Sequence, residues 1–119
     1  MAGQHDTSWR RILVVYESEA FFRGVQVFLS DAPGIQIVGA ERDARNAVEV
    51  TWCLEADVVV LEHLGVNEAR DLLVSLLELP GVRRIVTLSL ESTSARVYES
   101  HPLRVEGAAT LIAAVQGNR

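Results

Sequence analysis

The chain contains no lysine and only one cysteine, Cys53, among its 119 residues. A single cysteine excludes an internal disulfide and any metal cage built from several thiolates. The basic residues are scattered arginines and the net charge is −5, so we expect no direct binding to nucleic acid. No apolar run reaches the roughly 18 residues that a membrane-spanning helix needs.

The length and composition fit one globular domain. The hydrophobic content of 49% and the charged content of 23% are ordinary for such a domain. Residues 1–10 are polar and lack the apolar segment of a signal peptide, so they are interpreted as a flexible tail. We therefore expect a domain over residues 11–117 and a cytoplasmic location.

Short β-branched runs alternate with segments of helical periodicity along the chain. This alternation predicts an α/β fold with a doubly wound, five-stranded parallel sheet. Apolar residues recur every three or four positions in the predicted helices, and we expect those of the last helix to be buried. In the first helix these residues are Phe21, Phe22, Val25, Phe28 and Leu29, and in the last they are Ala108, Leu111, Ile112 and Val115.

The functional site of such a sheet is expected at the carboxyl ends of its strands. The predicted strands occupy about residues 12–15, 35–39, 58–61, 85–88 and 97–103. Tyr16 and Glu17 follow the first strand, Glu62 follows the third, and Ser89 follows the fourth. These four residues are the candidate site.

The order and spacing of several segments resemble the receiver domain of two-component response regulators. Residues 22–39 are similar to the family's first helix, turn and second strand, and residues 56–61 and 84–89 add to the likeness. The most similar subgroup is the one that precedes helix-turn-helix output domains. The resemblance implies a flavodoxin-like fold and a role in two-component signalling or a phosphorelay.

The resemblance also implies a phosphorylation site, and here the chain departs from the family. Tyr16 and Glu17 stand where the family has an acidic pair that holds Mg²⁺, and Glu62 stands at the phosphorylated Asp. Ser89 is an acceptable match to the family's Thr or Ser, whereas Arg104 replaces its Lys.

These substitutions predict that phosphotransfer is lost. Mg²⁺ requires near-ideal octahedral geometry, and Tyr16 removes one carboxylate. The Glu62 carboxylate lies one methylene further out than that of Asp, and a displacement of about 1 Å can lower a rate on the order of a hundredfold. The guanidinium of Arg104 is a broad planar fork rather than a point charge. We therefore expect neither catalytic residues nor a metal or cofactor.

Two arrangements of Glu62 stay open from the sequence. Its carboxylate pairs with the Arg104 guanidinium in one, and it points into solvent in the other. A metal site formed by Glu17, Glu62 and His63 is disfavoured, because adjacent residues of a strand point to opposite faces.

The fourth helix of the family has too few residues here. The polar segment 91–95 is short, so we expect this helix to be shortened or missing. His101 falls at the position of the family's switching aromatic residue, where it is either a pH sensor or an ordinary exposed histidine. Trp52 is expected either to cover the rim of the core or to anchor a partner.

The combined prediction is an atypical, phosphorylation-independent receiver domain that acts by binding. Its expected partner is another protein or a second copy of the chain. The resemblance also implies a C-terminal DNA-binding output domain outside this chain and control of transcription. Two alternatives remain, namely a receiver-derived sensor of small molecules and a receiver that is phosphorylated on Glu62.

Overall fold

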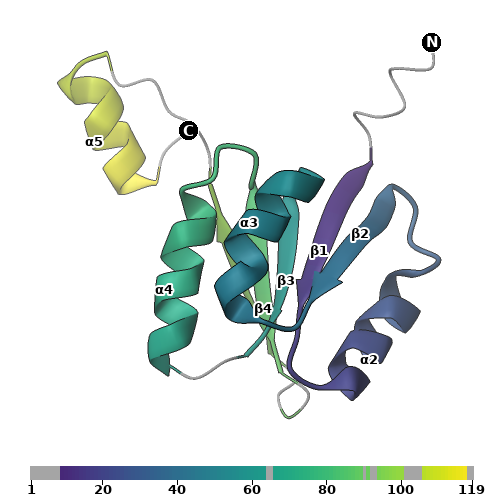
Figure 1. Cartoon of the computed structure of the whole chain (residues 1–119). Coiled ribbons are helices and arrows are strands. Elements are labelled where there is room, and N and C mark those ends of the chain that lie inside the picture. Colours follow the sequence, from purple (N-terminus) through teal and green to yellow (C-terminus); the bar gives the residue numbers. More distant parts are fainter. Residues whose placement is uncertain (1–8, 64–65, 90, 92–93, 101–105, 118–119) are drawn as a thin grey trace.

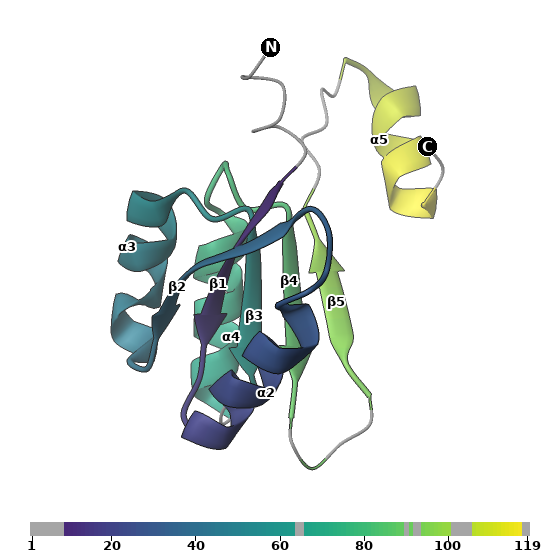
Figure 2. The same cartoon turned by 90° about the vertical axis from the view of Figure 1, so that its right-hand side faces the viewer.

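The computed structural model describes residues 9–63, 66–89, 91, 94–100 and 106–117. One five-stranded sheet forms its centre, with strand order β2-β1-β3-β4-β5 (Figures 1 and 2). The strands are β1 (Arg10–Val15), β2 (Ile35–Glu41), β3 (Val58–Glu62), β4 (Arg84–Leu88) and β5 (Arg96–Glu99). The helices are α2 (Glu19–Leu29), α3 (Ala44–Leu54), α4 (Val66–Leu77) and α5 (Ala108–Gln116).

The predicted α/β sheet is confirmed, but the prediction that all five strands are parallel is wrong. Strands β1 to β4 are parallel, whereas β5 pairs with β4 in the antiparallel direction. A parallel connection needs a crossover of about a dozen residues or more, and only residues 89–95 separate β4 from β5. The described residues of this segment contain no helix, as expected, and the chain therefore returns as a hairpin.

The core consists of two layers, one on each face of the sheet. Alternate residues of the central strands point to opposite faces, so Leu13 and Val59 pack under α3 and α4, while Ile12 and Val58 pack under α2. The first layer is closed by Leu76 of α4, which is fully buried. Within the described residues, no helix is long and apolar enough to cross a membrane.

Capping residues set where α2 and α3 begin. Ser18 precedes α2, and its hydroxyl accepts a hydrogen bond from the Phe21 amide at 3.3 Å. Asp43 precedes α3 as predicted, and its carboxylate accepts one from the Arg45 amide at 2.9 Å. Such caps satisfy amide groups that have no partner inside the helix.

Helix α5 does not cover the sheet, so the expected burial of its apolar residues is wrong. The helix forms where the sequence predicts it, but none of its residues is buried, and Leu111, Ile112 and Val115 are 52%, 54% and 79% exposed. Both views place α5 beyond the edge of the sheet where β1 begins (Figures 1 and 2). Phe28 of α2 is also largely exposed, by 85%.

Candidate functional site

The candidate site lies at the edge of the sheet formed by the carboxyl ends of β1 and β3. Strand β1 runs directly between β2 and β3, which brings Tyr16 and Glu17 close to Glu62 although 45 positions separate the two glutamates. The prediction that these residues share one edge of the sheet agrees with this arrangement.

Glu62 turns its carboxylate onto the start of α2. One oxygen, Oε1, accepts hydrogen bonds from the amides of Glu17 at 2.6 Å and Ser18 at 3.0 Å. The other, Oε2, accepts one from the Ser18 hydroxyl at 3.1 Å. The first amides of a helix have no partner within it, and the helix dipole favours a negative charge there. Glu62 therefore acts as a second cap of α2, supplied by a strand of the sheet.

This arrangement contradicts one of the two expectations for Glu62 and leaves the other untested. The alternative in which the side chain points into solvent is wrong, because both oxygens accept hydrogen bonds from protein groups. Arg104 and His101 lie outside the described residues. The expected pair between Glu62 and Arg104 and the switching role of His101 thus stay predictions.

Tyr16 places its ring where the family has an acidic side chain. The ring stacks on Phe22 of α2, with centroids 4.9 Å apart and planes inclined by 15°. The Arg42 guanidinium lies over the Tyr16 ring, 5.6 Å from its centroid. Offset stacking and a cation over an aromatic face both stabilise such an arrangement. The stack on Phe22 and the contact with Arg42 therefore hold the Tyr16 ring at this edge of the sheet.

Arg42 is the site residue that sequence reasoning missed. It follows β2 directly, so its position at a strand end was the signal that could have found it. Its guanidinium donates a hydrogen bond to the Glu17 carbonyl at 3.1 Å and lies 3.7 Å from the Glu19 carboxylate. Arg42 thereby ties the end of β2 to the chain that leads into α2.

The other candidate residues make local contacts. The Ser89 hydroxyl accepts a hydrogen bond from the Glu91 amide at 3.1 Å, just after β4. The His63 amide donates to the Leu88 carbonyl at 2.7 Å and its side chain is exposed. Over the described part of the chain, no group of three or more His, Cys, Asp or Glu residues is placed to hold a metal ion.

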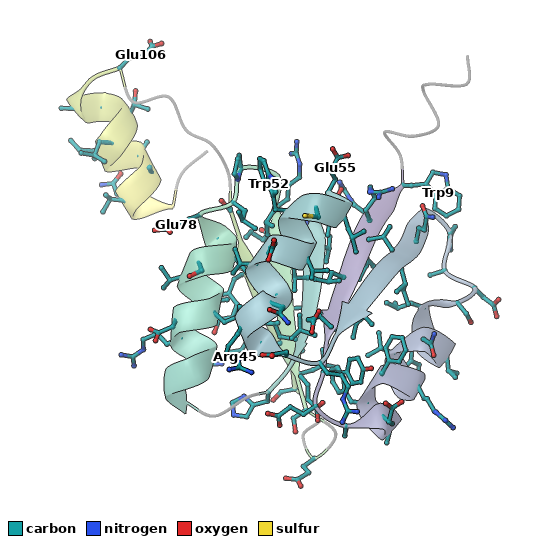
Figure 3. All side chains as sticks on the ribbon, viewed as in Figure 1. Trp9, Arg45, Trp52, Glu55, Glu78 and Glu106 are labelled. Carbon is teal, nitrogen blue, oxygen red and sulfur yellow. The ribbon has the colours of Figure 1, made fainter. Side chains whose placement is uncertain are left out.

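The exposed Trp52 lies in the last turn of α3, near the opposite edge of the sheet. Figure 3 shows Arg45 near the start of α3 and Trp52 and Glu55 at its other end. Trp52 is 60% exposed and, together with Leu79 and Val82, lines an open cavity of about 550 Å³. Trp52 thus lies at the rim of the core with most of its surface free.

Comparison with solved structures identifies the fold. The response regulator domain of CheB from Thermotoga maritima superposes with a TM-score of 0.58 at 22% identity, covering 92% of this chain and 73% of that one. The receiver domain of the response regulator NarL from Mycobacterium tuberculosis gives 0.57 at 22% identity, covering 93% and 79%. The chain has the fold of a response-regulator receiver domain.

A curated protein from Geobacillus kaustophilus also matches this receiver-type chain. The relative is a protein-glutamate methylesterase/protein-glutamine glutaminase, 29% identical over 114 residues. The match covers 89% of this chain but only 27% of the relative, so the chain spans about a quarter of that protein. No protein-family model matches the chain.

Proposed function

We propose that this chain is a phosphorylation-independent receiver domain, a signalling module that acts by binding another protein. The observation that carries the proposal is the Glu62 carboxylate, whose two oxygens accept three hydrogen bonds from Glu17 and Ser18. A phospho-acceptor must offer an oxygen to the incoming phosphoryl group. Here an attack by a Glu62 oxygen on the phosphoryl donor would first have to break the hydrogen bonds by which Glu62 caps α2.

The stack of Tyr16 on Phe22 supports the same proposal, because it bears on whether the site could hold Mg²⁺. An acidic pair and the acceptor would together hold Mg²⁺, which needs oxygen ligands at about 2.0–2.1 Å in octahedral order. Tyr16 presents a ring stacked on Phe22 instead of a carboxylate. Glu17 joins the network through its backbone, because its amide donates to Glu62 and its carbonyl accepts from Arg42.

The contacts of Glu62 also suggest how the domain works without phosphate. A phosphoryl group carries about two negative charges and three acceptor oxygens, which commonly order a neighbouring segment. The single charge of Glu62 already holds the end of β1 against the start of α2. We propose that this edge keeps one arrangement, and that signalling depends on which partner is present.

Receiver domains act on partner proteins or attached output domains, and we propose the same for this chain. Control of transcription through a DNA-binding output domain is the setting that the sequence resemblance favours. The esterase and glutaminase activities belong to the Geobacillus relative, and we propose no catalysis by the residues of this chain.

Intact-protein mass spectrometry after incubation with acetyl phosphate and Mg²⁺ tests the proposal. A receiver with a complete acidic pair, treated in parallel, serves as the positive control. We expect the mass of this chain to stay unchanged while the control gains one phosphoryl group. A phosphoryl adduct that disappears in Glu62→Gln would overturn the proposal and establish Glu62 as an acceptor.

A further inference from the structure

The open cavity beside Trp52 lies between the ends of two helices. The end of α3 contributes Trp52 and Ala56 to its lining, and the segment after α4 contributes Leu79 and Val82. Figure 3 shows Trp52 at the end of α3 and Glu78 at the end of α4. The cavity volume of about 550 Å³ falls within the roughly 300–1,000 Å³ of common binding pockets. The cavity is therefore large enough to receive side chains of a partner.

Trp52 supplies an aromatic face to this cavity. Its side chain is 60% exposed, whereas the preceding Thr51 is fully buried. Tryptophan is one of the residues that most often carry the binding energy of protein interfaces. The face of an indole ring also attracts cations. Trp52 thus offers a binding surface for a cationic group that has an apolar stem.

Glu55 places a carboxylate in the lining of the same cavity. Its backbone is left-handed, with φ 55° and ψ 44°, and among the described residues other than glycine it alone has a positive φ. Helices often end in this conformation, usually at glycine, because a Cβ is disfavoured there. Within the described residues, no cation forms an ion pair with the Glu55 carboxylate. The chain therefore keeps a carboxylate where glycine would be more stable.

The two helix ends add negative charge beside the cavity. The carboxyl end of a helix carries partial negative charge, and the last turns of α3 and α4 hold no basic residue. Arg11 and Arg83 belong to neighbouring segments, but no basic residue is among the described residues that line the cavity. The Arg11 guanidinium already donates to the carbonyls of Leu54 at 2.8 Å and Glu55 at 3.2 Å. A positively charged occupant therefore matches the cavity.

An arginine side chain has the shape and charge that this cavity requires. Its planar guanidinium stacks on aromatic faces and pairs with a carboxylate through two hydrogen bonds, and its stem is apolar. We propose that the cavity receives an arginine of the partner protein, with the guanidinium held by the Trp52 ring and the Glu55 carboxylate. Apolar partner residues beside that arginine contact Leu79 and Val82. Lysine fits less well, because its ammonium group is compact and strongly hydrated.

The inference rests on the proposed role as a binding module and states the chemistry of the partner. The cavity lies at the edge where β3 and β4 begin, whereas Glu62 lies where β3 ends. The two sites can therefore be tested separately. A phosphoryl adduct on Glu62 would overturn phosphorylation independence and would leave the result at the cavity unaffected.

Disulfide exchange at Cys53 tests the proposal in the intact chain. Cys53 is the only cysteine of the chain, it is exposed, and it lines the cavity, so the gain in protein mass reports the attached peptide. The probes are two capped tetrapeptides, Cys-Gly-Arg-Leu and its analogue with neutral citrulline in place of arginine. In competition with β-mercaptoethanol, we expect the arginine peptide to stay attached at an about tenfold higher concentration of reductant. Equal retention of the two peptides would overturn the proposal.

Variants show whether Trp52 and Glu55 cause the preference for arginine. Trp52→Ala and Glu55→Gln should each remove most of it, whereas Glu49→Gln, at an exposed position of α3 outside the lining, should not. A Cys53→Ser variant that also carries Val74→Cys moves the thiol to an exposed position of α4 outside the lining. This control should retain both peptides equally. A preference that persists in Trp52→Ala or Glu55→Gln, or that appears in the control, would overturn the proposal.

Glu55→Gly adds a measurement that a merely structural role would not move in the same way. Glycine adopts the left-handed conformation without a steric cost, so this variant should unfold at a higher urea concentration than wild type. We expect it to lose the preference for arginine at the same time, because the carboxylate is gone. A Glu55→Gly protein that is less stable than wild type, or that keeps the preference, would refute the role given to Glu55.

Discussion

Removal of the Glu62 carboxylate should destabilise the domain by an amount that its contacts predict. Three hydrogen bonds end on this side chain, and two of their donors are the backbone amides of Glu17 and Ser18, the two residues that precede α2. Hydrogen bonds to a charged group contribute about 1.5–3 kcal/mol, and a charge at a helix terminus adds about 0.3–1 kcal/mol. Because the side chain is only partly buried, water replaces some of these contacts. We expect Glu62→Ala to lower the free energy of unfolding by about 2–3 kcal/mol.

Two further variants separate charge from hydrogen bonding. Glu62→Gln keeps an oxygen that can accept from the amides of Glu17 and Ser18 but loses the charge, so we expect a loss of about 1 kcal/mol. Glu19→Gln removes a charge from the first turn of α2 and the exposed ion pair with Arg42 but no hydrogen bond to Glu62, and it should cost less than about 0.5 kcal/mol.

Urea unfolding followed by circular dichroism measures all three variants under the same conditions. The expected order of stability is wild type, Glu19→Gln, Glu62→Gln and Glu62→Ala, from highest to lowest. A Glu62→Ala protein within about 0.5 kcal/mol of wild type would refute the reasoning, because the carboxylate would then be a solvated surface group. Its removal would leave the start of α2 unaffected.

Three other predictions follow from the packing and the caps. A Cβ at Gly39 would meet a methyl of Leu54 at 2.5 Å, and because this flexible side chain can move aside, Gly39→Ala should lose no more than about 1 kcal/mol in urea unfolding, whereas Gly24→Ala, with open space around it, should gain up to about 1 kcal/mol. Tyr16→Ala should lose about 2–4 kcal/mol through its stacking and burial, while Tyr16→Phe keeps the ring and should match wild type within about 0.5 kcal/mol. Side-chain and backbone hydrogen bonds from Arg45 lower the pKa of the Asp43 carboxyl below 3.8. The stabilisation that this carboxylate gives is therefore present above pH 3.8 and is lost as the pH falls through its lower pKa in the folded state. In a stability curve measured against pH, an Asp43→Asn protein should lack this acid-dependent part.

The sequence predicted the parts of the fold that depend on local pattern. Strands β1 and β3 were predicted from their β-branched runs, and α3 was predicted from its helical spacing. Each of these patterns is typical of a single kind of element with a known buried face. The capping role of Asp43 followed from its position before α3. The position of Glu62 beside Glu17 followed from the parallel order of the central strands.

Long-range geometry could not be predicted in the same way. The antiparallel direction of β5 depends on the short connection after Leu88. The resemblance to a family whose sheet is parallel led to the prediction of the other direction. Helical periodicity shows which side chains share one face of α5 but not where the helix packs. The exposure of Leu111 could therefore not be predicted from it.

The sequence predicted which residues belong to the candidate site better than it predicted the contacts between them. Glu17 and Glu62 meet at one edge of the sheet, but the hydrogen bonds of Glu62 to the amides of Glu17 and Ser18 depend on side-chain torsions and backbone position. Arg42 was missed because it stands at the end of β2, away from the acidic positions that the resemblance implies.

The central claim is that this receiver fold has lost its phosphate switch, and one NMR titration tests it most directly. The amide resonances of Glu17 and Ser18 report on the hydrogen bonds to Glu62, and that of Ser89 reports on the end of β4. We predict that millimolar Mg²⁺ followed by beryllofluoride, a mimic of a bound phosphoryl group, leaves all three unchanged. Saturable shifts at these amides that extend into β5 would show a working switch and contradict the account.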